Sequence, residues 1–126
     1  MTKNIAMAFK FEELKVWRRA IEFTGQIHDL TRSFPKEELY ILTSQIKRAA
    51  DSIALNIAEG STGASNKQFA NFLGVAIRSG IEVVSCLYVG RTRKIISEEA
   101  FKESYNEVTV IIRMTQALRN AIEDKD

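Results

Sequence analysis

The chain has 126 residues, of which 45% are hydrophobic and 27% are charged, and its formal net charge is +2. This composition is typical of one globular domain and excludes disordered and collagen-like chains, while the single cysteine excludes an internal disulfide. Because no apolar run approaches the roughly 18 residues of a membrane span and no secretory signal pattern opens the chain, we expect a cytoplasmic protein without membrane contacts.

Three groups of helix-breaking residues divide the sequence, at positions 33–35, 60–64 and 90–96. Between them, apolar residues recur every three or four positions, which is the spacing of one face of a helix. The sequence therefore predicts a flexible N-terminal tail at residues 1–11 and one helical domain at residues 12–123. Its four helices should span about residues 12–32, 36–59, 66–89 and 98–123.

The first predicted helix, at residues 12–32, combines an apolar face with a basic cluster. Leu14, Trp17 and Ile21 follow helical spacing and are expected to face the core. The basic cluster near its start consists of Lys15, Arg18 and Arg19.

The second predicted helix begins near Pro35, which suits the first turn of a helix. Its apolar row starts at Leu39 and ends at Ile57. A polar row follows spacings of three and four residues, so its members share another face. These polar residues are Gln45, Arg48, Ser52, Asn56 and Glu59.

Folding the second and third helices into a hairpin about residue 62 places Ser52 near Leu73 and Glu82 within about a turn of Arg48. We therefore expect Arg48 to pair with Glu82. Two interpretations of the polar row stay open. It is either a hydrogen-bonded seam that fixes the register of the helices or a polar groove for a ligand.

The third predicted helix starts after Ser65, which forms a capping-box pattern with Gln68 three residues later. Its apolar row includes Phe69 and Leu73 and continues at helical spacing to Leu87. Cys86 lies within an apolar run and is interpreted as a buried thiol.

The fourth predicted helix starts after Ser97, a suitable cap. It carries two adjacent apolar rows, an arc wider than one core needs. The surplus is either part of a wide core or a surface for self-association, and we predict a homo-oligomer. The expected interface residues on the last two helices are Phe72, Ile81, Tyr88, Ile111, Met114 and Leu118.

Charge is unevenly distributed, since the first three-quarters of the chain are basic and the last quarter is acidic. The basic clusters are either solvated surface charges or contacts to nucleic-acid phosphates. The second interpretation gains weight if an oligomer repeats the clusters around an axis. The candidate nucleic-acid-binding residues are Lys15, Arg18, Arg19, Lys47, Arg91, Arg93 and Lys94.

The sequence contains no pattern typical of catalysis or metal binding. His28 is the only histidine, which excludes sites that need two histidines, and no Ser-His-Asp set or phosphate-binding loop can be argued. We therefore predict no catalytic residues, no metal and no cofactor.

Four helices of similar length joined by short loops are expected to run antiparallel to their sequence neighbours. The predicted fold is all-α, an antiparallel up-down-up-down four-helix bundle.

The run LTSQIKRAADSI at residues 42–53 and the segment NIAEG at residues 56–60 resemble a bacterial family of four-helix-bundle proteins. Its founding members are encoded by intervening sequences within large-subunit ribosomal RNA genes. The likeness extends from FEELKVW at residues 11–17 to the last helix, but Ala54 and Leu55 stand where the family often has Pro-Ser. The resemblance implies a homo-oligomer, commonly a pentamer, without an established catalytic activity.

A more distant similarity, to the accessory variability determinant proteins of retroelements, implies nucleic-acid binding through a basic surface. Together, the residues and the resemblance predict a non-enzymatic, homo-oligomeric accessory or scaffold protein that binds RNA or DNA. The alternative is a purely protein-binding module that binds no nucleic acid.

Overall fold

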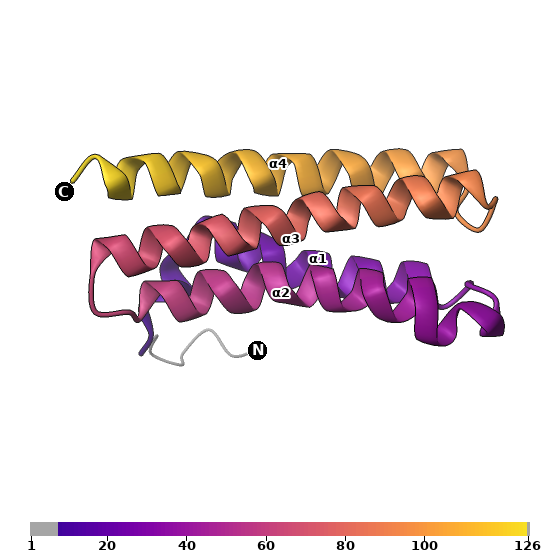
Figure 1. Ribbon diagram of the computed structural model, residues 1–126, viewed down its shortest axis with the longest axis horizontal. Helices are drawn as coiled ribbons and strands as arrows, with labels where there is room; N and C mark the ends of the chain where they lie inside the picture. Colours follow the sequence, from indigo (N-terminus) through magenta and orange to yellow (C-terminus); the bar gives the residue numbers. More distant parts are fainter. Residues whose placement is uncertain (1–7, 126) are drawn as a thin grey trace.

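The computed structural model describes residues 8–125, which form four α-helices and no strand. These are α1 (Lys15–Thr31), α2 (Ser44–Ser61), α3 (Asn66–Thr92) and α4 (Glu98–Glu123). Successive loops lie at opposite ends of the molecule, so each helix runs antiparallel to the next (Figure 1). The predicted all-α four-helix bundle is confirmed.

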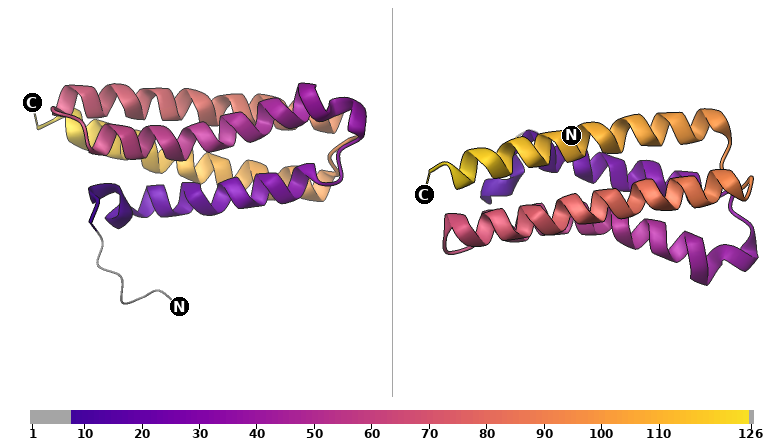
Figure 2. Two further views of the ribbon diagram at one scale, coloured as in Figure 1. Left: turned by 90° about the horizontal axis from the view of Figure 1, so that it is seen from below. Right: turned by 45° about the horizontal axis from the view of Figure 1, so that its top comes forward.

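The helices surround one hydrophobic core. In Figure 1, α3 lies between α2 and α4 and packs on both, and α1 completes the bundle beside α2 and α4 (Figure 2). Burying each large aliphatic side chain contributes roughly 1.5–3 kcal/mol. The largest fully buried side chains are Phe23, Ile27, Ile46, Ile53, Ile57, Leu73, Val83, Leu87, Val108, Ile111 and Thr115.

The two predicted serine caps are confirmed. Ser65 Oγ accepts a hydrogen bond from the Gln68 backbone N–H at 3.1 Å, and Ser97 Oγ accepts one from the Ala100 N–H at 3.1 Å. Each bond satisfies one of the amide groups that the first turn of a helix leaves without a partner. The Gln68 side chain accepts from the Ala64 N–H at 2.9 Å, which ties the turn before α3 to the helix.

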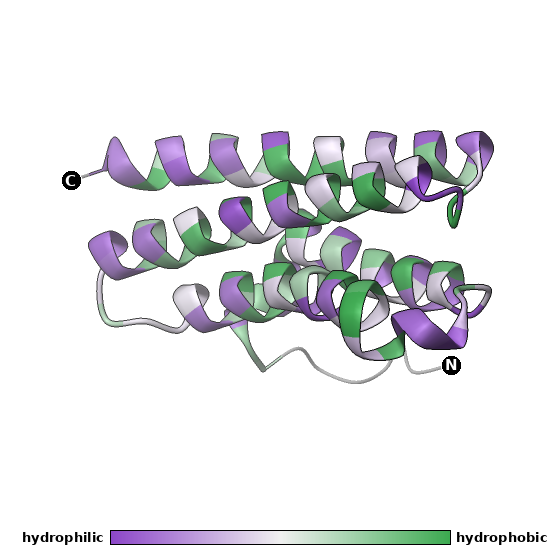
Figure 3. Ribbon diagram, turned by 45° about the vertical axis from the view of Figure 1, so that its right-hand side comes forward, coloured by the Kyte–Doolittle hydropathy of each residue, from purple (hydrophilic) through white to green (hydrophobic). Residues whose placement is uncertain are grey.

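The start of the second helical segment is irregular. A 3-10 turn at Lys36–Glu38 leads into a π-helical turn at Leu39–Thr43 before regular α2 begins. A π turn contains an additional residue and rotates the following side chains around the axis. Leu42 and Thr43 are buried, whereas Leu39, expected in the core, is rotated out of the buried row and is exposed. Figure 3 shows this hydrophobic turn beside the hydrophilic 3-10 turn.

The N-terminal region also contains a short element. A 3-10 turn spans Lys10–Glu13 and contacts α1 and α2. It includes Lys10 and Phe11, which belong to the segment predicted as a flexible tail. Residues 1–7 of that predicted tail lie outside the described residues.

The buried face of α1 differs from the expected one. Ile21 is exposed, and Leu14 and Trp17 only pack against the edge of the core. An alternative helical row beginning at Val16 faces inward instead, because two overlapping apolar rows follow the same spacing and packing selects one of them. The buried row consists of Val16, Ala20, Phe23, Ile27 and Thr31.

The wide apolar arc of α4 mostly serves the core of its own subunit. Ile111, predicted at an oligomer interface, is fully buried, so that assignment is corrected. The face of α4 that points into the core includes residues of both apolar rows, so each row is buried in part. Met114 and Leu118 are partly buried against the core and keep part of their surface exposed.

Contrary to the expectation from the sequence, α3 is long and apolar enough, by length and composition, to cross a membrane. In the bundle it packs between α2 and α4 and buries residues that include Phe69, Leu73 and Leu87. A central helix needs apolar residues on more than one face, so a core helix passes the same test.

Candidate nucleic-acid interface and polar groove

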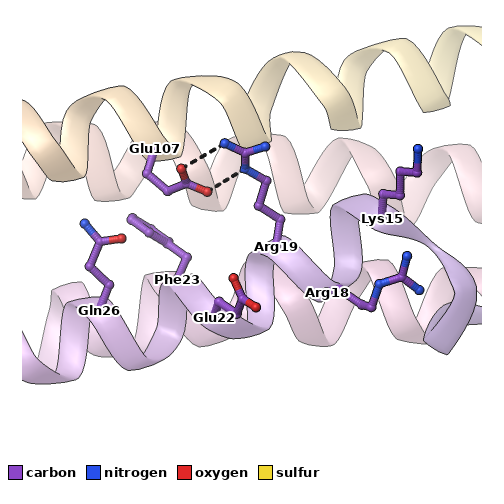
Figure 4. Close-up of a pocket in the computed structure, with 7 residues that line it drawn as sticks. All are labelled: Lys15, Arg18, Arg19, Glu22, Phe23, Gln26 and Glu107. Carbon is purple, nitrogen blue, oxygen red and sulfur yellow. Dashed lines mark hydrogen bonds and ion pairs between the residues drawn. The ribbon is translucent and has the colours of Figure 1, made fainter. Parts of the chain in front are cut away.

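The first basic cluster lies at the start of α1. Lys15, Arg18 and Arg19 line a cleft of about 550 Å³ in which Glu107 of α4 takes part (Figure 4). Consecutive turns of α1 bring these three side chains to one region of the surface. The structure therefore brings this predicted set together.

Arg19 is held by an internal contact. Its Nε donates to Glu107 Oε2 at 2.7 Å and its Nη2 donates to Oε1 at 3.2 Å, and Glu107 raises the pKa of the guanidinium. Arg18 donates from Nη1 to the Glu12 carbonyl oxygen at 2.8 Å. In Figure 4, Lys15 and Arg18 point away from the Arg19–Glu107 pair. Lys15 and Arg18 are thus the members of the cluster best placed to contact a phosphate.

The second basic group, at the end of α3 and the loop after it, is at the opposite end of the bundle from the start of α1. Arg93 Nη1 donates to both carboxylate oxygens of Glu38 at 3.2 Å. Arg91 stacks over the Phe101 ring at 4.0 Å from its centroid and pairs with Glu98 at 3.6 Å. Both arginines therefore connect parts of the bundle.

The remaining two candidates are Lys94 and Lys47. Lys94 has a φ of 62°, a left-handed conformation that turns the chain out of α3. Lys47 lines a shallow groove together with His28, Arg48 and Asp51. The seven predicted contacts thus occupy separate regions of one subunit and do not form one patch.

The polar row on α2 has two distinct parts. Near the middle of the helix, Ser52 Oγ and Ser79 Oγ lie 2.8 Å apart, and Asn56 Nδ2 donates to Ser52 Oγ at 2.9 Å. This part is a hydrogen-bonded seam between α2 and α3. Ser52 therefore faces Ser79 and not Leu73, because the turn between the helices is centred later in the chain than residue 62.

The other part of the row is open to solvent. Gln45 Nε2 donates to Glu82 Oε2 at 3.3 Å, so Gln45 takes the place expected for Arg48. Arg48 is exposed, as is Glu59. Of the interactions described for residues 8–125, none joins Arg48 to Glu82. Arg48 and Glu82 still line one groove of about 500 Å³. The full lining of this groove is Tyr40, Ile41, Gln45, Arg48, Ala49, Ser52 and Glu82.

Sequence reasoning missed Tyr40, Ile41 and Ser79. Leu39, Tyr40 and Ile41 are three consecutive apolar residues, which cannot all face inward on a helix. This pattern could have predicted an exposed apolar side chain here. The pairing of Ser79 with Ser52 depends on the register between helices, which no local pattern contains.

Cys86 is buried, as predicted. Burial raises the pKa of its thiol to about 11, and the charge of Glu82 adds to the increase. No group of three or more His, Cys, Asp or Glu residues within the described part of the chain could hold a metal ion.

The fold and surface define a class of protein, a small antiparallel four-helix bundle whose candidate functional features lie on its exterior. The model of the 23S rRNA-intervening sequence protein family matches residues 12–117, and the chain belongs to this family. The resemblance found in the sequence is confirmed.

A solved structure shares this fold. It is a protein of unknown function from the S23 ribosomal protein family of Bacteroides thetaiotaomicron, with a TM-score of 0.78 and 24% sequence identity. The match covers 83% of this chain and 95% of the other. The search of curated proteins finds no match. The family and this structural neighbour carry no established activity, so a function has to be argued from the surface of the molecule.

Proposed function

We propose that this protein is a non-enzymatic, self-associating helical bundle that binds RNA as an accessory or scaffold. The observation that carries the proposal is the basic cluster at the start of α1. Lys15 and Arg18 are exposed there and point away from the Arg19–Glu107 pair (Figure 4).

Exposed lysine and arginine side chains bind phosphates by displacing condensed counterions. A subunit with a net charge of +2 has few such contacts to offer. Self-association would repeat the Lys15–Arg18 cluster on each subunit, so that several phosphates could be contacted together. The pentamer implied by the family resemblance is the assembly that we propose.

Self-association has support from the apolar surface. Ile81 on α3 is 55% exposed, and Tyr88, about two turns further along the same helix, is 44% exposed. Phe72, Met114 and Leu118 keep part of their surface accessible. Ile81 and Tyr88, two helical turns apart, lie on one face of α3, and large exposed apolar side chains on one face favour a contact between protein surfaces.

The test measures binding of a structured RNA by fluorescence anisotropy from about 50 to 200 mM salt, a range in which phosphate contacts lose much of their strength. The double variant Lys15→Glu/Arg18→Glu should bind more weakly than the native protein and show a shallower salt dependence. The matched control Lys102→Glu/Arg113→Glu changes the net charge equally on exposed α4 residues and should lose less affinity.

The alternative function is a protein-binding module that binds no nucleic acid. Absence of RNA binding by the native protein at about 50 mM salt would reject the proposal and favour this alternative. An equal loss of affinity in the α1 variant and the α4 control would show that only net charge matters and would reject the α1 cluster as the site.

A further inference from the structure

The π-helical turn before α2 places an aromatic ring in solvent. Tyr40 is 88% exposed, although the last two residues of the turn, Leu42 and Thr43, are buried. Tyr40 borders two adjoining grooves, one toward α3 with Gln45, Arg48 and Glu82, the other toward α1 with His28 and Lys47. An exposed tyrosine ring between polar grooves offers a flat apolar face beside hydrogen-bonding groups.

Tertiary contacts attach the turn to the rest of the bundle at both of its ends. Glu38, immediately before it, is 9% exposed and accepts hydrogen bonds from Arg93 and from the Leu42 N–H at 3.4 Å. The Leu42 side chain is anchored in the core. Tyr40 is therefore presented by a backbone that tertiary contacts hold in place, which lowers the entropy lost when a ligand stacks on it.

The groove toward α3 presents donors and acceptors side by side. Within residues 8–125, Glu82 accepts one long hydrogen bond, from Gln45 at 3.3 Å, and a carboxylate can accept more than one. Arg48 is exposed and carries five N–H donors. A ligand that stacks on Tyr40 and enters this groove would meet a carboxylate and a guanidinium.

Guanine is the base whose edges fit this combination. Its N1–H and N2–H groups donate in the direction that a carboxylate requires, and its O6 and N7 atoms accept from arginine. In a duplex the Watson–Crick edge is already paired, so the base has to be unpaired. We propose that Tyr40, Arg48 and Glu82 form a site for an unpaired guanine of single-stranded RNA, an inference that rests on the proposed RNA-binding function.

A second copy of this chain is a less suitable occupant. A protein surface that covered the groove would remove Arg48 and Glu82 from water, which is costly unless the partner supplies matching groups. A nucleotide supplies matching groups with its base edge, and its phosphate can approach Lys47 or Arg48. The cations beside Tyr40, exposed Arg48 and half-buried Lys47, thus favour RNA.

The experiment uses oligouridine of about ten nucleotides, within the range that a single-strand site spans, with one central guanosine or, as a comparison, one central adenosine. Binding is measured by anisotropy at low salt. Native protein should prefer the guanosine oligomer. Tyr40→Ala should weaken its binding about 5-fold or more, because stacking on an aromatic residue contributes strongly to the affinity of each base.

Two further variants test the individual roles. Tyr40→Phe keeps the ring and should bind like the native protein. Glu82→Gln removes the carboxylate and should reduce the preference for guanosine over adenosine more than it reduces binding to the adenosine oligomer. Leu55→Ala removes an exposed apolar side chain of α2 that lies outside the groove lining, and should change neither affinity.

The outcomes separate this inference from the proposed function. If native protein binds no RNA, both fail. If native protein binds RNA but Tyr40→Ala binds like native, only the guanine site fails. If Tyr40→Ala instead dissociates an assembly in sedimentation and leaves RNA affinity unchanged, Tyr40 contacts a second copy and the inference is wrong. Free guanosine monophosphate that binds as tightly as the oligomer would overturn the assignment to RNA.

Discussion

Replacing Arg93 with alanine should destabilise the bundle while leaving RNA binding nearly unchanged. The sequence placed Arg93 among the candidate phosphate contacts, but its Nη1 donates to both carboxylate oxygens of Glu38 at 3.2 Å. The contact connects the start of the second helical segment to the loop after α3. Its loss leaves Glu38 with the backbone N–H of Leu42, at 3.4 Å, as its hydrogen-bond donor within the described residues.

The expected loss of stability follows from the exposure of the Arg93 and Glu38 side chains. The side chain of Glu38 is 12% exposed and that of Arg93 is 49% exposed. Breaking a fully buried ion pair costs about 3–5 kcal/mol, and breaking an exposed one costs about 0–1 kcal/mol. A pair with one buried carboxylate and one half-exposed guanidinium lies between these limits, so we expect a loss of about 1–2 kcal/mol, or roughly 3–8 °C in Tm.

The assay is urea unfolding at one fixed protein concentration, because self-association would add to the apparent stability. Arg93→Ala, Glu38→Gln and the double variant complete a thermodynamic cycle. The double variant should be no less stable than Arg93→Ala, since glutamine leaves no buried charge without a partner. A coupling energy below about 0.3 kcal/mol, or a loss of RNA affinity without a loss of stability, would refute the structural role of Arg93.

Gly80→Ala should destabilise the protein by about 1–3 kcal/mol in the same unfolding assay, because a Cβ there would lie 2.7 Å from Ile112 Cγ1. Gly25→Ala, in an exposed part of α1 where a Cβ would meet nothing within 4 Å, should instead be neutral or stabilise by up to about 1 kcal/mol; equal effects would contradict the close packing of α3 on α4. Cys86 should react with a maleimide at pH 8 only when the protein unfolds, since its thiol has a pKa of about 11. Because the thiol pKa is higher in the folded state than the ordinary value of 9.0, the stability linked to this group should be complete below pH 9 and decrease as the pH rises toward 11; rapid labelling of folded protein would contradict its burial. Ile81→Lys should reduce the molecular mass measured by sedimentation, and an unchanged mass would place the oligomer contact elsewhere.

Local patterns in the sequence were sufficient for the four helices and for the ends that a serine cap marks, whereas α1 begins later than expected, at Lys15, and regular α2 begins only at Ser44. The caps at Ser65 and Ser97 depend on residues three positions apart, and the chain between breakers follows helical spacing. For this reason α4 begins and ends at the residues expected, Glu98 and Glu123. The apolar row of α3 through Phe69, Leu73 and Leu87 was also identified correctly.

The sequence did not decide which side chains are buried wherever two rows of similar residues share a helix. On α1, Val16 and Ala20 compete with Trp17 and Ile21, and only contact with the other helices selects the buried row. The burial of Ile111 has the same origin. The π turn at Leu39–Thr43 was also not predicted, and it removes Leu39 from the buried row that continues from Leu42.

The sequence alone therefore determined that this protein is a four-helix bundle, because helix formation and capping depend on neighbours within about one turn. Tertiary structure decided which charges are available for binding. Arg19 meets a partner 88 residues away and Arg93 meets one 55 residues away, and no local pattern contains such pairs. The packing of α2 against α3 likewise places Tyr40, Arg48 and Glu82 along one groove, an arrangement that no local pattern contains.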